Sequence, residues 1–487
     1  MKRRSKKPKI ELPDCILSII FSKLGLKDLV KTSALSKRWL QEWRLRMDQN
    51  FDLQNMFDLR YNTVQELPKS LPLFQGFQSE FAKRLDQFML HYQGDMISSI
   101  RVNFPLGDEY RSVIGRLISQ GITKGAKSIE LLLSYETNDS DFVVEIKPYK
   151  FSLTRLSHTD SLTNLHLQKC CLVAPMEFSG LKNLRTLVLH LVDVERDMLH
   201  GIFSNCIHLV DLTLDDCKFN FDLELCGLKN LRTLVLHLVS VKQDMLHGLF
   251  SNCIHLVDFT LDGCNFNSDL EINSSTLLNL NIVNCGFHMG VRRNIDIIAS
   301  NLSSIEYSFN CNYPIHRMNI EAHMLSKFSY RGSQISSYDG GQIYKAFGFS
   351  GLKNVTTIIF DGLRECLQSA VVMLLFSQCL QLENATFKNC RIINNLNIVS
   401  PKLRHLKIIE CDYNHIYPHN INISALNLSS FEYSGQATRY IFVTAPKLLK
   451  VFWNAAKREK NPDPFGPIAR LRHIENLVMI LSTSQVS

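Results

Sequence analysis

Two stretches of the sequence space their residues in ways that suggest a nucleotide site and a metal site. Gly121–Ser128 nearly matches the phosphate-binding pattern G-x-x-x-x-G-K-S, with alanine in place of the second glycine. A helical pattern precedes this stretch and a strand pattern follows it, whereas a phosphate-binding loop leads from a strand into a helix. Cys411, His415 and His419 are spaced for metal binding, but a proline breaks the helix that this spacing requires. The sequence therefore predicts no nucleotide, no metal and no other cofactor.

Motifs of the common hydrolases are also missing. The sequence contains neither a G-x-S-x-G nucleophile turn nor an H-E-x-x-H zinc motif. Its cysteines and histidines recur at repeat positions instead of forming an isolated nucleophile–base pair. We therefore expect a chain that performs no catalysis itself.

The net charge is concentrated at the N-terminus. Residues 1–10 hold six of the 54 lysines and arginines and no acid, so the remainder has 48 basic against 46 acidic side chains. A nearly neutral body argues against a broad nucleic-acid-binding face. The basic segment 1–10 is either a nuclear address or a solvated, disordered tail.

No segment has the length and apolarity of a membrane span. The apolar run Cys15–Phe21 is far shorter than the roughly 18–20 residues that cross a bilayer as a helix. Acidic residues and a proline separate it from the basic start, which argues against a secretory signal. We therefore expect no membrane partner, a location in the nucleus and/or cytoplasm, and cysteines that are mostly reduced thiols.

The sequence repeats itself on two scales. Residues 180–225 and 227–272 are identical at 37 of 46 positions, and a third, diverged copy begins at Phe349. Each copy contains the shorter pattern L-x-x-L-x-L twice, and this pattern recurs in 16 units about 25 residues apart, which is typical of a solenoid. The units begin at Ile97, Ala126, Leu162, Leu184, Leu209, Leu231, Leu256, Leu277, Leu302, Leu325, Val355, Leu382, Leu403, Leu428, Leu448 and Ile474.

Each unit is expected to form one short strand and one helix. In residues 184–190 leucines alternate with other residues at the period of a strand, whereas residues 193–206 place apolar side chains on one helical face. A single strand and helix cannot bury their apolar surfaces, but stacked copies can. The sequence therefore predicts an α/β solenoid with parallel strands on the concave face.

The cysteines follow the same repeat. Six of them lie eight residues after the first apolar residue of their unit, and three more end the expected helices. A buried thiol behaves as a small apolar group, so we predict structural thiols. They are Cys170, Cys217, Cys264, Cys285, Cys390 and Cys411, and then Cys206, Cys253 and Cys379.

Histidines and aspartates alternate along one column of the expected concave face. Parallel strands are about 4.8 Å apart, so each histidine of the column is expected between two aspartates, which favours imidazolium. The pattern predicts a mixed-charge patch that binds a protein with basic residues; alternatively, duplication merely copied a surface pattern. The candidate substrate-binding residues are His190, Asp211, Asp215, His237, Asp258 and Asp262.

The N-terminal residues 11–47 predict a small helical module. Apolar residues recur at steps of three and four between Ile16 and Leu24, Pro13 suits a first helical turn, and Gly25 suits a stop. Two further short helices are expected. Three helices of this size have too little core to be stable alone, so the module should share its apolar surface with a partner.

Residues 48–95 are expected to form a helical linker and an N-terminal cap. Two prolines and a glycine within Leu67–Phe77 predict a break in any helix there. Residues 79–92 then place apolar side chains at helical spacing, which suits a cap over the first repeat.

The segment LPDCILSIIFSKLGLKDLVKTSALSKRW resembles the F-box motif in the form found in plant F-box/leucine-rich-repeat proteins. The match comprises the LP start, the I-x-x-x-I-x-x-x-L helix, the L-K-D-L turn and the T-S-A-L-S-K-R-W end, while Cys15 replaces a frequent acidic residue. The repeated units resemble leucine-rich repeats over roughly 380 residues. A C-terminal FBD segment, which many relatives carry, is not identified.

The resemblance implies a three-helix F-box at 11–47 and a leucine-rich-repeat solenoid at 96–481. It also implies a substrate-recognition adaptor of an SCF-type ubiquitin ligase, with the F-box binding a Skp-type adaptor, and through it a cullin, and the repeats binding a protein substrate. Alternatives are an interaction scaffold outside the ligase, or a ligand-gated hormone co-receptor that would need a pocket of clustered Lys and Arg. By the resemblance the adaptor-binding residues would be Leu12, Pro13, Ile16, Ile20, Leu24, Leu29, Leu35 and Trp39.

Overall fold

The structure is a computed structural model, and it describes most of the chain. The chain divides into two compact units, residues 1–209 with 217–220 (unit 1) and residues 210–216 with 221–487 (unit 2). The predicted tail 1–10 lies outside the described residues. These are 13–32, 39, 46–57, 71–134, 146–157, 159–173, 178–219, 223–225, 227–288, 294–309, 317–332, 350–362, 369–392, 395–411, 420–436, 440–456 and 474–480.

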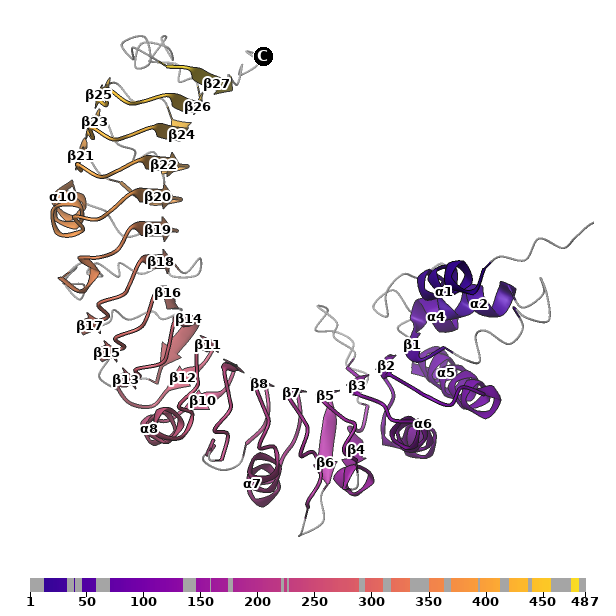
Figure 1. Ribbon diagram of the computed structural model, residues 1–487. Coiled ribbons are helices and arrows are strands. Elements are labelled where there is room, and N and C mark those ends of the chain that lie inside the picture. Colours follow the sequence, from indigo (N-terminus) through magenta and orange to yellow (C-terminus); the bar gives the residue numbers. More distant parts are fainter. Residues whose placement is uncertain are drawn as a thin grey trace, which may run out of the picture. The chain divides into compact units, whose positions relative to one another are not determined.

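Unit 1 begins with two short helices and continues into a parallel sheet whose strands pair in register with the next one along the chain (Figure 1). Its strands are β1 (Asp48–Asp52), β2 (Ser99–Asn103), β3 (Ser128–Leu132), β5 (Asn164–Gln168) and β7 (Thr186–His190), with β4 (Tyr149–Ser152) paired to β6 (Cys170–Val173). Its helices are α1 (Asp14–Lys23), α2 (Leu26–Thr32), α4 (Leu53–Met56), α5 (Leu71–His91), η3 (Asp108–Tyr110), α6 (Arg111–Thr123), η4 (Leu153–Leu156) and α7 (Arg196–Asn205).

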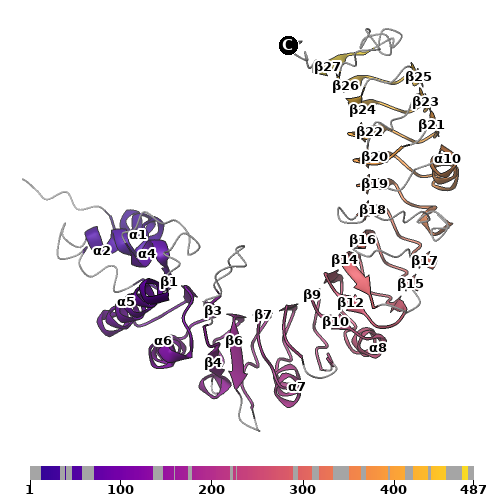
Figure 2. The same cartoon turned by 180° about the vertical axis from the view of Figure 1, so that it is seen from behind.

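Unit 2 repeats the same parallel pairing (Figure 1). Its strands line the inner side of a curved stack, as predicted, with α8 (Gln243–Asn252) and α10 (Ser369–Gln378) on the outer side (Figure 2). The inner strands are β8 (Asp211–Asp215), β9 (Thr233–His237), β11 (Asp258–Asp262), β14 (Asn279–Phe287), β16 (Ser304–Phe309), β18 (Lys327–Arg331), β19 (Thr357–Asp361), β20 (Asn384–Lys388), β22 (His405–Ile409), β24 (Ser430–Gln436), β26 (Lys450–Ala456) and β27 (Asn476–Ile480).

The outer segments of unit 2 differ from the prediction of one helix per unit. Several are strands that form small parallel sheets of their own. Their two-residue period was visible in the sequence, since Ile295 and Ile297 alternate with polar residues and are buried. These elements are β10 (Ser240–Val241), β12 (Asn265–Phe266), β13 (Leu270–Asn273), β15 (Asn294–Ile298), β17 (Arg317–Glu321), η5 (Ser350–Leu352), β21 (Asn395–Val399), β23 (Asn420–Ser424) and β25 (Tyr440–Thr444).

The repeat positions form the core. Fifteen of the sixteen residues that begin the predicted units are buried, and only Ile474 is half-buried. Within β7, Leu187 and Leu189 are buried while the residues between them are half-exposed, and the other inner strands alternate in the same way. We call the side that carries the first, third and fifth residue of each inner strand the strand face.

Residues 48–95 differ from the prediction in two respects. Helix α5 begins at Leu71 and runs through the stretch where a break was expected. Pro72 lies in its first turn, where an amide has no intrahelical acceptor to lose, so this proline does not break the helix. The second difference is β1, a strand whose core positions hold Gln49 and Phe51. Because glutamine replaces the usual leucine, the repeat pattern did not reveal this unit.

The stretch Gly121–Ser128, which nearly matches a phosphate-binding loop, serves to pack a helix closely against a strand. Gly121 lies in α6, where an added Cβ would come within 2.1 Å of Ile100, and the chain then turns into β3. This helix-to-strand order was predicted. Among the described residues, no helix is long and apolar enough to cross a membrane, and no three His, Cys, Asp or Glu side chains gather around a common point. His415 and His419 lie outside the described residues.

In nine repeats a residue with φ between +44° and +73° lies seven positions after the first apolar residue, directly after the inner strand in eight of them and inside β14 in the ninth. Gly263 occupies this position with a φ of +61°, and an added Cβ would lie 2.7 Å from Leu238 Cδ2. Asn284 and Asn389 occupy the same position in other units. Gly263→Val should therefore lower the free energy of unfolding by about 2 kcal/mol, because a β-branched residue is strained there, and Gly263→Asn by much less. Equal losses in urea denaturation would contradict this account.

Candidate functional site

The first candidate surface is the exposed side of α1. The amide N–H of Ile16 donates a 3.0 Å hydrogen bond to the carbonyl of Pro13, which starts the helix. Ile16 and Ile19 lie one helical turn apart and are 42% and 58% exposed. We call these two residues the isoleucine pair. They form an apolar surface on a helix too short to have a core of its own.

Several predicted adaptor-binding residues surround this pair. Pro13 is exposed, whereas Ile20, Leu24 and Trp39 are half-buried. The Trp39 ring packs edge-on against Phe21, with centroids 4.9 Å apart and planes at 80°. This contact shows that Trp39 contributes to the packing of the helical module itself.

The positions of the three other predicted adaptor-binding residues are described only in part or not at all. Leu29 lies in α2, and Leu12 and Leu35 lie outside the described residues. Ile20 is among the residues predicted from the sequence and Ile19 is not, although both are isoleucines on the same helix. Helical phase does not separate them, because residues three and four positions after Ile16 both lie on its side of the helix, so the packing of α1 decides which one is exposed.

The α1–α2 module is attached to the first strand of the sheet in unit 1. Arg46 Nη1 donates a 2.8 Å hydrogen bond to the carbonyl of Leu24, at the end of α1. At Gly25 an added Cβ would come within 2.8 Å of Asn55 Oδ1, so glycine allows the turn to approach α4 closely. Asp52 caps α4 by accepting a 2.8 Å hydrogen bond from the Asn55 amide. The module and the repeats of unit 1 are therefore joined by direct contacts.

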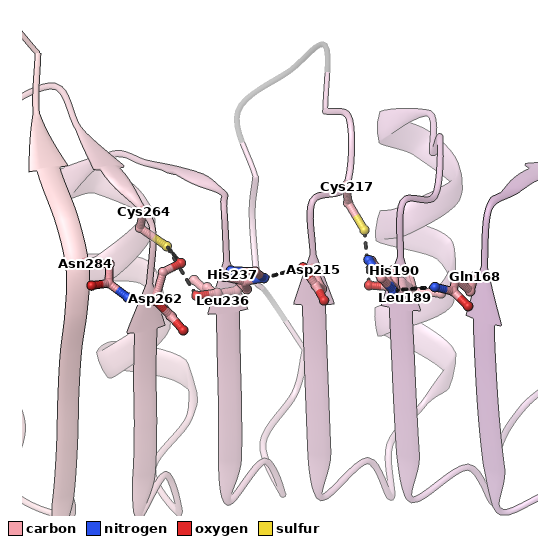
Figure 3. A network of polar contacts seen from close by, with 10 residues as sticks. All are labelled: Gln168, Leu189, His190, Asp215, Cys217, Leu236, His237, Asp262, Cys264 and Asn284. Carbon is pink, nitrogen blue, oxygen red and sulfur yellow. Dashed lines mark hydrogen bonds and ion pairs between the residues drawn. The ribbon is translucent and has the colours of Figure 1, made fainter. Parts of the chain in front are cut away.

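On the strand face of unit 1, His190 does not have the expected aspartate neighbour on the side of β5. Its Nδ1 lies 3.0 Å from Gln168 Nε2 (Figure 3). Nearby, Arg101 forms a 3.4 Å ion pair with Glu130. Burial lowers the pKa of His166, even though the Glu130 carboxylate favours its protonated form.

On the strand face of unit 2, the predicted charge column is present around His237. Its Nδ1 lies 2.5 Å from Asp215 Oδ1 on β8, and Asp262 on β11 stands in register on its other side (Figure 3). The side chains of Asp258 and Asp262 accept hydrogen bonds from asparagine amides at 2.6 and 3.2 Å. Asp211, the sixth predicted residue, begins β8 and is half-exposed.

The remaining carboxylates on the strand face of unit 2 are differently arranged. Glu306 pairs with an arginine at 3.0 Å, Asp361 with a lysine at 3.6 Å, and Glu432 with a lysine at 2.7 Å. Within the described part of the chain, neither Asp258 nor Asp262 has a lysine or arginine within ion-pair distance. The sequence did not reveal this difference, because cross-strand partners come from units 20 to 30 residues apart.

The cysteines behave as buried structural groups. Cys264 Sγ donates to the carbonyl of Leu236 at 3.2 Å, and Cys285 Sγ donates to that of Leu261 at 3.4 Å, so each thiol reaches back to the preceding unit. Burial raises the pKa of Cys206 to about 12 and has the same effect at Cys379. Cys206 and Cys379 are therefore poor nucleophiles at neutral pH.

Family models match two parts of the chain. The F-box domain matches residues 10–46, and the model described as "At1g61320/AtMIF1, LRR domain" matches residues 99–219 and 210–340. The predictions of an F-box and of leucine-rich repeats are therefore confirmed, and so is the predicted fold class.

The curated relatives are plant proteins. The F-box/LRR-repeat protein At3g26922 of Arabidopsis thaliana is 28% identical over 42% of this chain and 57% of its own. The putative FBD-associated F-box protein At1g61330 of the same plant is 30% identical over 42% of this chain and 38% of its own. The matched region thus spans between about a third and three-fifths of these relatives. Among solved structures, an internalin of Listeria monocytogenes is 12% identical over 65% of this chain and 80% of its own, with a TM-score of 0.30.

Proposed function

We propose, from the premise that this chain is an F-box protein with leucine-rich repeats, that it is a substrate-recognition adaptor of an SCF-type ubiquitin ligase. The F-box binds a Skp-type adaptor and through it a cullin, and the repeats bind a target protein. The chain performs no catalysis in this role, because ubiquitin transfer belongs to the recruited enzymes. It acts in the nucleus and/or cytoplasm.

The observation that carries this proposal is the isoleucine pair. Ile16 and Ile19 expose large aliphatic side chains on α1, inside the segment that matches the F-box domain. Neighbouring exposed aliphatic side chains on one helix face can supply the apolar centre of a protein-binding surface. Size-exclusion chromatography of the purified chain with a plant Skp-type adaptor tests it. A stoichiometric complex is expected, and two separate peaks would favour a scaffold outside the ligase.

The target is proposed to bind the strand face of unit 2 around His237. Among the described residues, Asp258 and Asp262 have amide partners but no lysine or arginine partner, which suits them to bind lysine or arginine side chains of another protein. The hormone co-receptor alternative has less support. On this face Arg331, Lys388 and Lys407 are already paired with carboxylates, which leaves them less suited to hold an anionic ligand.

Removing the carboxylates of Asp258 and Asp262 together should weaken target binding by about tenfold or more, because each contributes to an attractive field for a basic partner. Asp258→Ala with Asp262→Ala is the test variant, and Glu432→Ala, whose carboxylate is already neutralised by a lysine, is the matched control. Quantitative mass spectrometry of captured proteins measures the effect. A double variant that retains every partner would exclude these residues from target binding.

A further inference from the structure

In unit 2, four consecutive leucine-rich repeats carry an unbroken row of exposed apolar residues along one edge of the stack. Each residue lies in the turn that leads into β20, β22, β24 or β26, two positions before the first leucine. The members, called here the edge row, are Leu380, Pro401, Leu426 and Pro446.

Side-chain contacts show that these turns are stacked on one another. Lys402 Nζ donates to Gln381 Oε1 of the preceding turn. Asn427 Nδ2 donates to the carbonyl of Pro401 at 2.7 Å, and Lys447 Nζ donates to Asn427 Oδ1 at 2.8 Å. The four turns therefore follow one another at the spacing of the parallel strands, about 4.8 Å.

Turn chemistry explains the prolines of the edge row but not its leucines. Proline favours the second position of a tight turn, which both prolines occupy. Leu380 and Leu426 are 58% and 57% exposed and have no such role. Elsewhere in unit 2 the same position holds polar residues such as Lys229 and Ser275, so three or more consecutive apolar turns occur in the described residues only here.

Positive charge flanks the edge row. Lys402 and Lys447 bond to neutral amide oxygens, and in the part of the chain that is described no carboxylate lies within ion-pair distance of either. The nearby Glu383 is already paired with Arg404 at 3.7 Å, and Glu475 lies in the next unit at the end of the row. The described part of this edge therefore places the apolar edge row beside two lysines that have no carboxylate partner there.

We propose that the edge row binds an acidic amphipathic α-helix of a partner protein. A helix advances about 5.4 Å per turn, close to the strand spacing, so a helix along the stack can present one apolar residue to each turn of the row. Carboxylates beside its apolar stripe would meet Lys402 and Lys447. Four apolar residues offer far less than the roughly 800 Å² per partner of a stable dimer, which favours a single helix over a second copy of this chain.

A pair of synthetic helical peptides tests the proposal with the full chain. Both have leucines on one face for about four turns; one carries glutamate at the flanking positions and the other carries lysine. Fluorescence anisotropy should show that the glutamate peptide binds at least about tenfold more tightly, with an affinity that falls as salt rises. Lys402→Glu with Lys447→Glu should reverse this preference.

Leu380→Ser with Leu426→Ser should weaken the glutamate peptide about tenfold or more, because the apolar contact area is lost. Ile207→Ser with Ile254→Ser, at equivalent isolated turns, is the matched control and should leave binding unchanged. Circular dichroism confirms that each variant remains folded. Equal binding of the two peptides, binding of neither, or unaltered binding by the leucine variant would overturn the proposal.

Discussion

Replacing Ile16 and Ile19 together by aspartate should reduce the affinity for a Skp-type adaptor at least a hundredfold. Each isoleucine contributes about 1.5–3 kcal/mol when it is fully buried at an interface, and both are about half-exposed in the free chain. Aspartate removes this contribution and places an unpaired charge against an apolar partner, which adds a further cost. Isothermal titration calorimetry with the purified adaptor measures the change.

A matched control separates the F-box surface from exposed apolar residues in general. Leu73 and Leu90 lie on α5 and are 57% and 76% exposed, so aspartate is tolerated there. Leu73→Asp with Leu90→Asp should leave adaptor affinity within about twofold. If the isoleucine and leucine variants lose affinity to the same extent, the adaptor does not dock on the isoleucine pair.

Phe81→Ala should lower the free energy of unfolding of unit 1 by about 3–5 kcal/mol. Phe81 is fully buried on α5, and its ring stacks on Phe104 with centroids 4.3 Å apart and planes at 5°. Phe57, next to α4, lies 6.2 Å from the same ring. Truncation therefore removes a ring contact between α5 and Phe104, the residue that follows β2.

The loss should be local, because neighbouring units of a repeat protein stabilise mainly one another. Hydrogen-exchange mass spectrometry should show faster exchange in β1 and β2 and unchanged exchange in β22 and β24. Phe376→Ala truncates a buried ring of α10. It should instead accelerate exchange in β22 and β24 and leave exchange in β1 and β2 unchanged. Uniform acceleration along the whole chain in both variants would contradict this account.

The fold could be predicted because leucine spacing and burial coincide. The residues that begin the units recur about every 25 positions and are buried nearly without exception, so one periodic signal fixes both strand and core. The signal fails where polar residues take core positions. Gln49 is almost fully buried in β1 where a leucine would have revealed a unit. The period of about 25 residues alone also does not distinguish outer helices from outer strands; that distinction requires the two-residue alternation inside the outer segment, as at Ile295 and Ile297.

The candidate surfaces could be predicted only in part. The F-box segment was recognisable from its motif, yet which isoleucines point outward depends on how α1 packs, and Ile19 was missed. The column around His237 followed from strand spacing alone. By contrast, the pairing of Lys407 with Glu432 depends on a contact between separate repeats, and so does the lack, among the residues that the structure describes, of such a partner at Asp262.

We propose that the F-box of this chain recruits degradation machinery while the repeats hold a target. The most direct test uses plant cells that express either the wild-type chain or the Ile16→Asp, Ile19→Asp variant. Proximity labelling first identifies the proteins that both chains hold, and the half-life of each of these proteins is then compared between the two cell lines. The account predicts a protein that both chains capture and that turns over faster only with the wild type. Capture by both chains with the same half-life would contradict it.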